Sequence, residues 1–141
     1  MLTTKTNLTP SLMSPTISPV LVFLLLSLHQ SICSSAHDAA SARSFSSCLA
    51  IHGVSNFSLP ASPSYNTTLN FSIRNRRFTL PDVTRPAAIV LPGSKEDLQR
   101  AILCARNSSL AIRVRSGGHS YEGLSYTTEN HVPFIVIDLM K

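Results

Sequence analysis

The chain has 141 residues, 43% of them hydrophobic, and carries a formal net charge of +5. This length suits about one domain with a core of ordinary size. The basic excess is small and scattered, with one cluster at Arg74, Arg76 and Arg77, which a solvated strand or turn explains better than a nucleic-acid surface. The sequence also lacks zinc-ligand spacing and interleaved aromatic residues. We therefore predict no nucleic-acid partner and no metal site.

The first 35 residues are typical of a secretory signal peptide. Residues 20–28 form an apolar run that is too short to span a bilayer, and small residues follow it. We expect cleavage between Cys33 and Ala36, which predicts a secreted protein with no stable membrane anchor. An uncleaved anchor and a buried helix are the alternatives.

Two further features agree with secretion. Removal of Cys33 with the signal peptide would leave Cys48 and Cys104, an even number compatible with one disulfide in an oxidising compartment. Two buried free thiols are the alternative. Acceptor sequons for N-linked glycans are dense in the rest of the chain. They begin at Asn56, Asn66, Asn70 and Asn107.

The segment 36–84 combines a short helix with a connection. An apolar pattern with helical spacing predicts a helix over residues 44–52, which Gly53 ends. Residues 56–84 are polar and interrupted by prolines, so we expect an irregular surface connection. We expect four apolar side chains to attach it to the main domain: Tyr65, Phe71, Ile73 and Phe78.

The organised domain, residues 85–141, begins with a strand, a helix and a second strand. Residues 87–91 are apolar, and Ser94 has the position of an N-cap for a helix that runs to about Asn107. The second strand is expected over residues 110–115. This order predicts a parallel crossover unit, and it delivers the following turn to the carboxyl edge of the sheet, where α/β units bind ligands.

The last residues, 134–139, form another apolar run of β type. A buried strand of this kind needs neighbours on both sides. We expect those neighbours to lie outside these 141 residues, so that the sequence is a partial form of a longer protein.

The turn after residue 115 is the candidate site. Gly117 and Gly118 lack a Cβ, which allows positive φ and a close approach of backbone to ligand. Successive N–H groups in such a turn can converge on an anion, with Ser116 and Ser120 as additional hydroxyl donors. His119 offers an imidazole that can act as base, metal ligand or nucleophile. An ordinary turn is the alternative.

Four runs together carry a family resemblance: residues 86–92, 94–104, 113–123 with Arg-Ser-Gly-Gly-His inside it, and 134–139. They resemble the first part of the FAD-binding domain in berberine bridge enzyme-like oxidases, which are flavoproteins of the vanillyl-alcohol oxidase and p-cresol methylhydroxylase (PCMH) type. The resemblance implies an α+β fold with a βαβ start, incomplete in this chain. Residues 1–35 would be the signal peptide, 36–84 a glycosylated N-terminal segment, and 85–141 the first part of the FAD-binding domain.

The resemblance also implies roles for the residues of the turn. In that family the histidine of the motif, here His119, is bonded covalently through Nδ1 to FAD. The family's N-terminal disulfide falls on Cys48 and Cys104. The turn and its neighbours would bind the cofactor: Arg115, Ser116, Gly117, Gly118, Ser120 and Tyr121.

An oxidoreductase is therefore the implied function. In the complete enzyme, hydride would pass from a small-molecule substrate to FAD, with O₂ as the final acceptor. The family's second flavin-linked cysteine, catalytic base and active-site tyrosines fall beyond these residues, so we assign no catalytic residue and expect this chain alone to be inactive. An extracellular location (cell wall or apoplast) or the vacuole would follow. The alternatives are a non-catalytic secreted glycoprotein fragment and an unrelated nucleotide-binding module.

Overall fold

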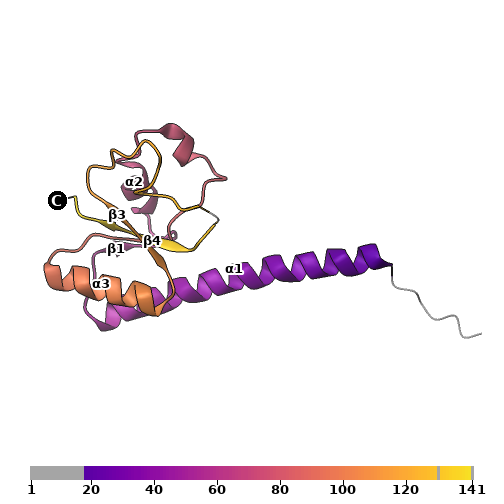
Figure 1. Ribbon diagram of the computed structural model, residues 1–141. Helices are drawn as coiled ribbons and strands as arrows, with labels where there is room; N and C mark the ends of the chain where they lie inside the picture. The colour runs from indigo at the N-terminus through magenta and orange to yellow at the C-terminus, as the bar shows by residue number, and fades with distance from the viewer. Residues whose placement is uncertain (1–17, 130, 141) are drawn as a thin grey trace, which may run out of the picture. The chain divides into compact units, whose positions relative to one another are not determined.

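The computed structural model describes residues 18–129 and 131–140. It divides into two compact units, Met1–Cys33 and Ser34–Lys141. The helices are α1 (Pro19–Ile51), α2 (Tyr65–Asn70), the 3-10 helix η1 (Arg76–Thr79) and α3 (Lys95–Asn107), and the strands are β1 (Phe57–Ser58), β2 (Ala88–Val90), β3 (Ala111–Arg115) and β4 (Phe134–Asp138) (Figure 1).

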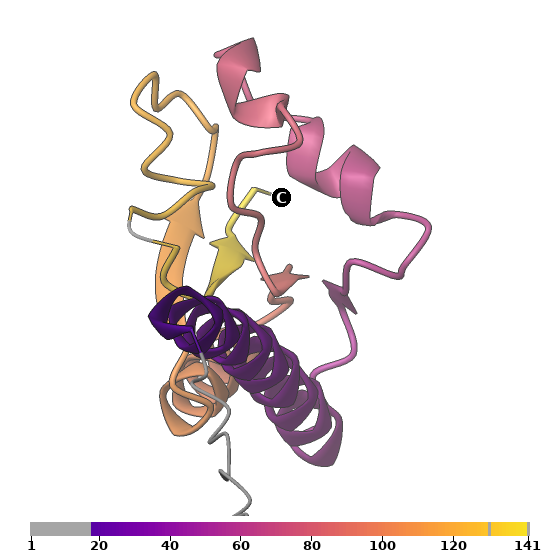
Figure 2. The same cartoon turned by 90° about the vertical axis from the view of Figure 1, so that its right-hand side faces the viewer.

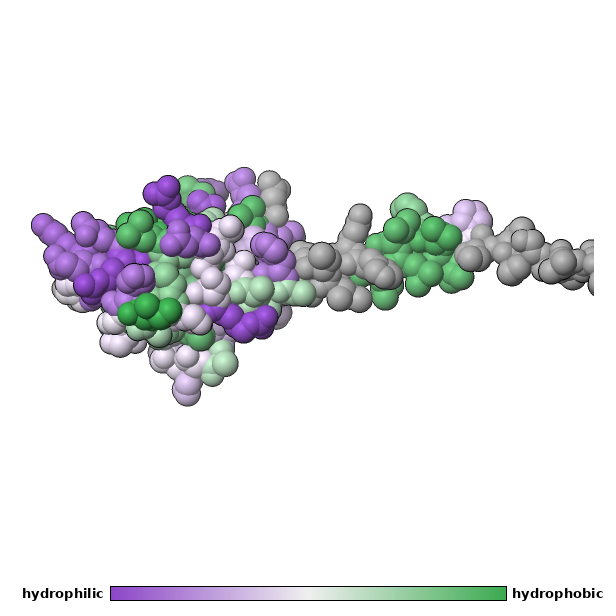
Figure 3. Space-filling model, turned by 90° about the horizontal axis from the view of Figure 1, so that it is seen from below, coloured by the Kyte–Doolittle hydropathy of each residue, from purple (hydrophilic) through white to green (hydrophobic). Residues whose placement is uncertain are grey.

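The first unit contains the beginning of α1. Its apolar side chains from Val20 to Leu28 are exposed, as the space-filling view in Figure 3 shows. Among the described residues, no helix is long and apolar enough to cross a membrane. Residues 1–17 of the expected signal peptide lie outside the described residues, and its cleavage stays a prediction.

The second unit is built on a four-stranded sheet with the order β1-β2-β4-β3. Strands β2, β4 and β3 are parallel, whereas β1 is antiparallel to β2. The expected crossover unit is present, but β4 lies between its two strands. This arrangement corrects one expectation: the strand at 134–138 pairs on both sides within the described chain, so it needs no neighbour from elsewhere.

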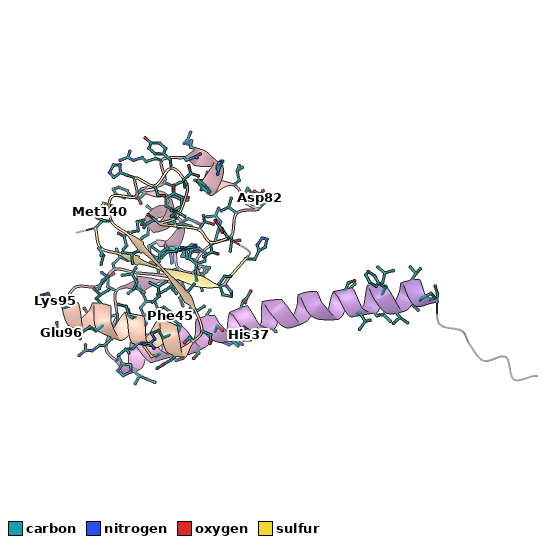
Figure 4. All side chains as sticks on the ribbon, viewed as in Figure 1. His37, Phe45, Asp82, Lys95, Glu96 and Met140 are labelled. Carbon is teal, nitrogen blue, oxygen red and sulfur yellow. A yellow bond between two sulfur atoms is a disulfide. The ribbon has the colours of Figure 1, made fainter. Side chains whose placement is uncertain are left out.

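The two faces of the central strands enter separate cores, because successive side chains of a strand point to opposite faces. Residues 34–51 of α1 and helix α3 cover one face, and α2 with the segment 116–128 covers the other (Figures 1 and 2). Phe45, labelled in Figure 4, packs in the first core with Ala101 and Ile137. The second core contains Val136 and Tyr126. Burial on both faces explains why β2 and β4 are almost continuously apolar.

Helix α3 forms where the sequence predicts it. The Ser94 hydroxyl accepts a hydrogen bond from the backbone N–H of Asp97 at 3.0 Å, so the predicted N-cap is confirmed. Glu96 and Asp97 in the first turn complement the positive end of the helix dipole. Figure 4 shows Lys95 and Glu96 at this end of α3. Leu98, half-buried, packs on the first core, as expected for the apolar face.

The connection 56–84 is more regular than predicted, because it contains β1, α2 and η1. Three of the four expected attachments are correct, since Tyr65 is buried and Ile73 and Phe78 pack against the second core. Phe71 was a wrong choice, because its side chain is 73% exposed. Helix α2 explains the difference: spacing i, i+4 turns Tyr65 and Leu69 inward, and Phe71 falls off that face.

The end of α1 is joined to α3 by the Cys48–Cys104 disulfide, which confirms the pairing that the family resemblance implies. The helix ends at Ile51 and Gly53 adopts φ +74°, as expected for a glycine stop. His52 lies near both sulfur atoms. Since the two sulfurs are bonded to each other, this cluster offers no pair of thiolates to a metal.

Tyr65 should make stability depend on pH in alkaline solution. Its hydroxyl donates to the carbonyl oxygen of Pro86, and burial raises the pKa of Tyr65 to about 12, with Arg85 acting in the opposite direction. In the unfolded chain a tyrosine has a pKa of about 10. Between these two values the folded state keeps a proton on Tyr65 that the unfolded state loses. The contribution of Tyr65 to the free energy of unfolding is therefore fully present below pH of about 10, and it is lost as the pH rises through about 12.

Chemical unfolding across this pH range measures the effect. The unfolding midpoint of the wild type should fall with pH more steeply than that of a Tyr65→Phe variant, which has no phenol to ionise there. Tyr121→Phe is the matched control, because Tyr121 is 72% exposed, and it should follow the wild type. A Tyr65→Phe variant that falls as steeply as the wild type would contradict the assignment.

Candidate functional site

The candidate site lies at the carboxyl edge of the parallel strands. The register pairs Val90 of β2 with Ile137, and Arg115 of β3 with Asp138. All three strands therefore end at the same edge, and the turn 116–118 leaves β3 there. This is the edge that the sequence predicts for ligand binding.

Only one of the two glycines in the turn uses the left-handed region. Gly118 has φ +66° and is buried, whereas Gly117 does not adopt a positive φ. The expectation of positive φ is thus correct for Gly118 alone. Among the described residues, the backbone N–H groups of residues 117–121 have no hydrogen-bond acceptor. A group of unpaired N–H donors in a turn is the arrangement that binds anions.

The two glycines have different close neighbours. A Cβ at Gly118 would lie 2.5 Å from the Cβ and Oγ of Ser72, so the backbone there is pressed against this residue, two positions after the end of α2. A Cβ at Gly117 would lie 2.5 Å from Cδ2 of His119. The imidazole of His119 therefore lies over Gly117, and a side chain at residue 117 would displace the ring.

His119 itself is exposed and has no hydrogen-bond partner in the described part of the chain. Ser116 is exposed beside it. The Ser120 hydroxyl accepts from the backbone N–H of Leu124 at 3.1 Å and keeps its own proton free to donate. Tyr121 is held by its carbonyl oxygen, which accepts from Asn75 Nδ2 at 3.2 Å.

An aromatic pair, which the sequence analysis missed, fixes the loop after the turn. The Tyr126 hydroxyl donates to the carbonyl oxygen of Ser120 at 2.7 Å. Its ring meets Phe78 edge to face, with ring centroids 5.6 Å apart. Gly123, at φ +76°, lies directly on the Phe78 ring. The sequence signal that could have predicted this packing was the presence of Gly123 and Tyr126 in one polar loop.

Arg115 occupies a different place from the one expected of a cofactor ligand. Its side chain is buried in the protein, where it pairs with Asp138, and Val114 rather than Arg115 is the exposed residue of the strand end, at 56%. The guanidinium also donates to the carbonyl oxygens of Thr68 and Leu69 in α2. A direct contact between Arg115 and a cofactor stays a prediction.

Taken together, the residues of the turn fit the diphosphate of a dinucleotide. The absence of a Cβ at Gly117 and Gly118 allows a diphosphate to approach the backbone closely. The unpaired N–H groups of the turn can donate hydrogen bonds to it. Ser72 Oγ is buried without a hydrogen-bond partner in the described chain, directly against the turn. Ser116 and His119 lie exposed in the same turn. The arrangement favours an anionic cofactor over a neutral one.

Comparison with known families gives the same assignment. Residues 86–141 match the family described as an FAD binding domain. This match covers β2, α3, β3, the glycine turn and β4. The chain thus contains part of a flavoprotein FAD-binding domain.

Individual relatives identify the family. Berberine bridge enzyme-like C-1 of Nicotiana tabacum is 50% identical over 97 residues, which are 68% of this chain and 17% of that protein. Reticuline oxidase of Eschscholzia californica is 51% identical over 98 residues, covering 67% and 18%. The structure of berberine bridge enzyme from Eschscholzia californica aligns with a TM-score of 0.62 and 49% identity, covering 67% of this chain and 19% of that one.

The chain belongs to the berberine bridge enzyme-like family of FAD-dependent oxidoreductases. It spans less than a fifth of the length of these two curated relatives.

Proposed function

We propose that this chain supplies the cofactor-binding turn of a secreted FAD-dependent oxidoreductase, with His119 as the covalent attachment point. The observation that carries the proposal is the turn at the carboxyl edge, where Gly118 adopts φ +66° and unpaired N–H donors lie beside an exposed imidazole. A diphosphate and a reactive ring would then be offered from one short loop.

Each residue of the turn has a task in this proposal. The N–H groups of residues 117–121 and the Ser116 hydroxyl would neutralise the diphosphate. His119 would bond to the flavin through Nδ1, a role that needs an imidazole with no other partner, and it has none among the described residues. Held there, FAD would supply the acceptor for hydride from a small-molecule substrate of the complete enzyme, with O₂ as the final acceptor. These residues orient the flavin and hold it during that chemistry.

Secretion is part of the proposal. The apolar run 20–28 supports a signal peptide, and the Cys48–Cys104 disulfide supports an oxidising compartment. We propose an extracellular or vacuolar protein. All four sequon asparagines are exposed, as glycosylation requires: Asn56, Asn66, Asn70 and Asn107.

The test of the proposal is a mass measurement on the full-length protein produced in a eukaryotic secretory pathway. After acid precipitation and digestion, the peptide that contains residues 116–126 should carry the mass of FAD or of its flavin fragment. A His119→Ala variant should lose this adduct, because alanine has no nucleophilic nitrogen. His52→Ala, which changes an exposed histidine away from the turn, is the control and should keep it.

Two outcomes would contradict the proposal at different levels. An unmodified wild-type peptide in a protein that is fully loaded with FAD would show that His119 only borders the site. A protein that takes up no FAD under any condition would overturn the cofactor assignment itself.

A further inference from the structure

A buried ion pair at the carboxyl edge ties three elements together. Arg115 of β3 and Asp138 of β4 are opposite in register, and Nη2 lies 2.6 Å from Oδ2 with side-chain exposures of 0% and 4%. The same guanidinium donates to the carbonyl oxygens of Thr68 and Leu69, at 2.7 and 2.8 Å. These carbonyls belong to the last turn of α2. The last carbonyl oxygens of a helix have no N–H partner within it.

Helix α2 in turn supports the glycine turn. Ser72 follows the helix, is 3% exposed, and is the residue against which Gly118 is pressed. The Ser72 hydroxyl has no hydrogen-bond partner in the described chain, so the contact with Gly118 is made by packing. Because packed groups transmit displacements directly, a shift of the end of α2 would move the backbone of the turn.

We infer that Arg115 is a positioning residue of the cofactor site: by joining Asp138 to the end of α2, it holds Ser72 against Gly118 and so fixes the N–H groups of the turn. This inference rests on the proposed function, in which the turn binds FAD. In this role the residue acts from inside the protein, through α2.

The chemistry of the side chain supports this role. A guanidinium is a planar fork of five N–H donors, so it can serve one carboxylate and two carbonyl oxygens at once. A lysine ammonium is a single point of charge and would keep the Asp138 partner while losing the fork. Arg115→Lys therefore preserves the positive charge but loses the hydrogen bonds to the carbonyl oxygens of α2. The variant thus separates the effect of positioning from the effect of charge.

The test compares three forms of the full-length protein: wild type, Arg115→Lys, and Arg106→Lys as a control on the exposed end of α3. Hydrogen exchange should accelerate over residues 65–72 in Arg115→Lys alone. The same variant should bind FAD about tenfold more weakly. It should also show a smaller covalently bound share of its flavin and an altered visible absorption spectrum, which lost stability alone would not produce.

Two results for the variant would overturn the inference. Faster exchange over residues 65–72 with unchanged affinity, covalent share and spectrum would show that α2 does not control the turn. Weaker FAD binding with unchanged exchange would show that Arg115 acts on the cofactor directly. If Arg115→Lys does not fold, Asp138→Asn, which weakens the ion pair that anchors the guanidinium, carries the same test. A wild type that binds no FAD would overturn the proposed function and this inference with it.

Discussion

Replacing both Cys48 and Cys104 with alanine should lower the free energy of unfolding by about 4 kcal/mol, the chain-entropy value for a loop of this size, since 56 positions separate the two cysteines. The bond restricts the unfolded chain and ties the end of α1 to α3 in the folded one. Cys104 is also fully buried in the first core, so part of its packing is lost with the sulfur. Urea unfolding of the oxidised wild type and the double variant measures the difference.

The reduced wild type is the matched control for this experiment. It keeps both sulfur atoms in the core and loses only the covalent bond, so it should fall between the two other forms. An unfolding midpoint that is identical in the oxidised and reduced wild type would show that the bond contributes nothing to stability. Peptide mapping under non-reducing conditions should recover the two cysteines in one linked pair.

Replacing Gly118 with valine should weaken FAD binding at least about thirtyfold, equivalent to about 2 kcal/mol. A positive φ of +66° is costly for any residue with a Cβ, and a β-branched side chain is the least tolerant. In addition, the new Cβ would lie 2.6 Å from the backbone oxygen of Ser72, which cannot rotate away as a side chain can. The turn must therefore deform, which displaces its unpaired N–H groups. Titration of the flavin-free protein with FAD measures the effect.

Two control variants separate the causes. Gly53→Val meets a similar φ of +74° with nothing within 4 Å, so it should cost stability without changing FAD affinity. Gly117→Ala would disturb only the His119 ring, so it should lower covalent attachment more than affinity. Unchanged FAD affinity in Gly118→Val would remove the turn from the cofactor site.

The sequence by itself determined the elements whose signals are local. The apolar period and the Ser94 cap placed α3, because an N-cap hydrogen bond spans three residues and needs no tertiary context. The same holds for the stop at Gly53. The family motif placed the glycine turn after β3 and the Cys48–Cys104 pair, and both are found there.

Only the tertiary structure decided which strands meet and which side chains are buried. Strand β4 enters between β2 and β3, and this choice depends on hydrogen bonds between segments far apart in the chain. The same pairing places Asp138 opposite Arg115, so that this basic residue is buried and paired inside the protein. A charge becomes tolerable in a core only when a distant partner is brought within hydrogen-bond distance, and no local pattern in the sequence records that partner.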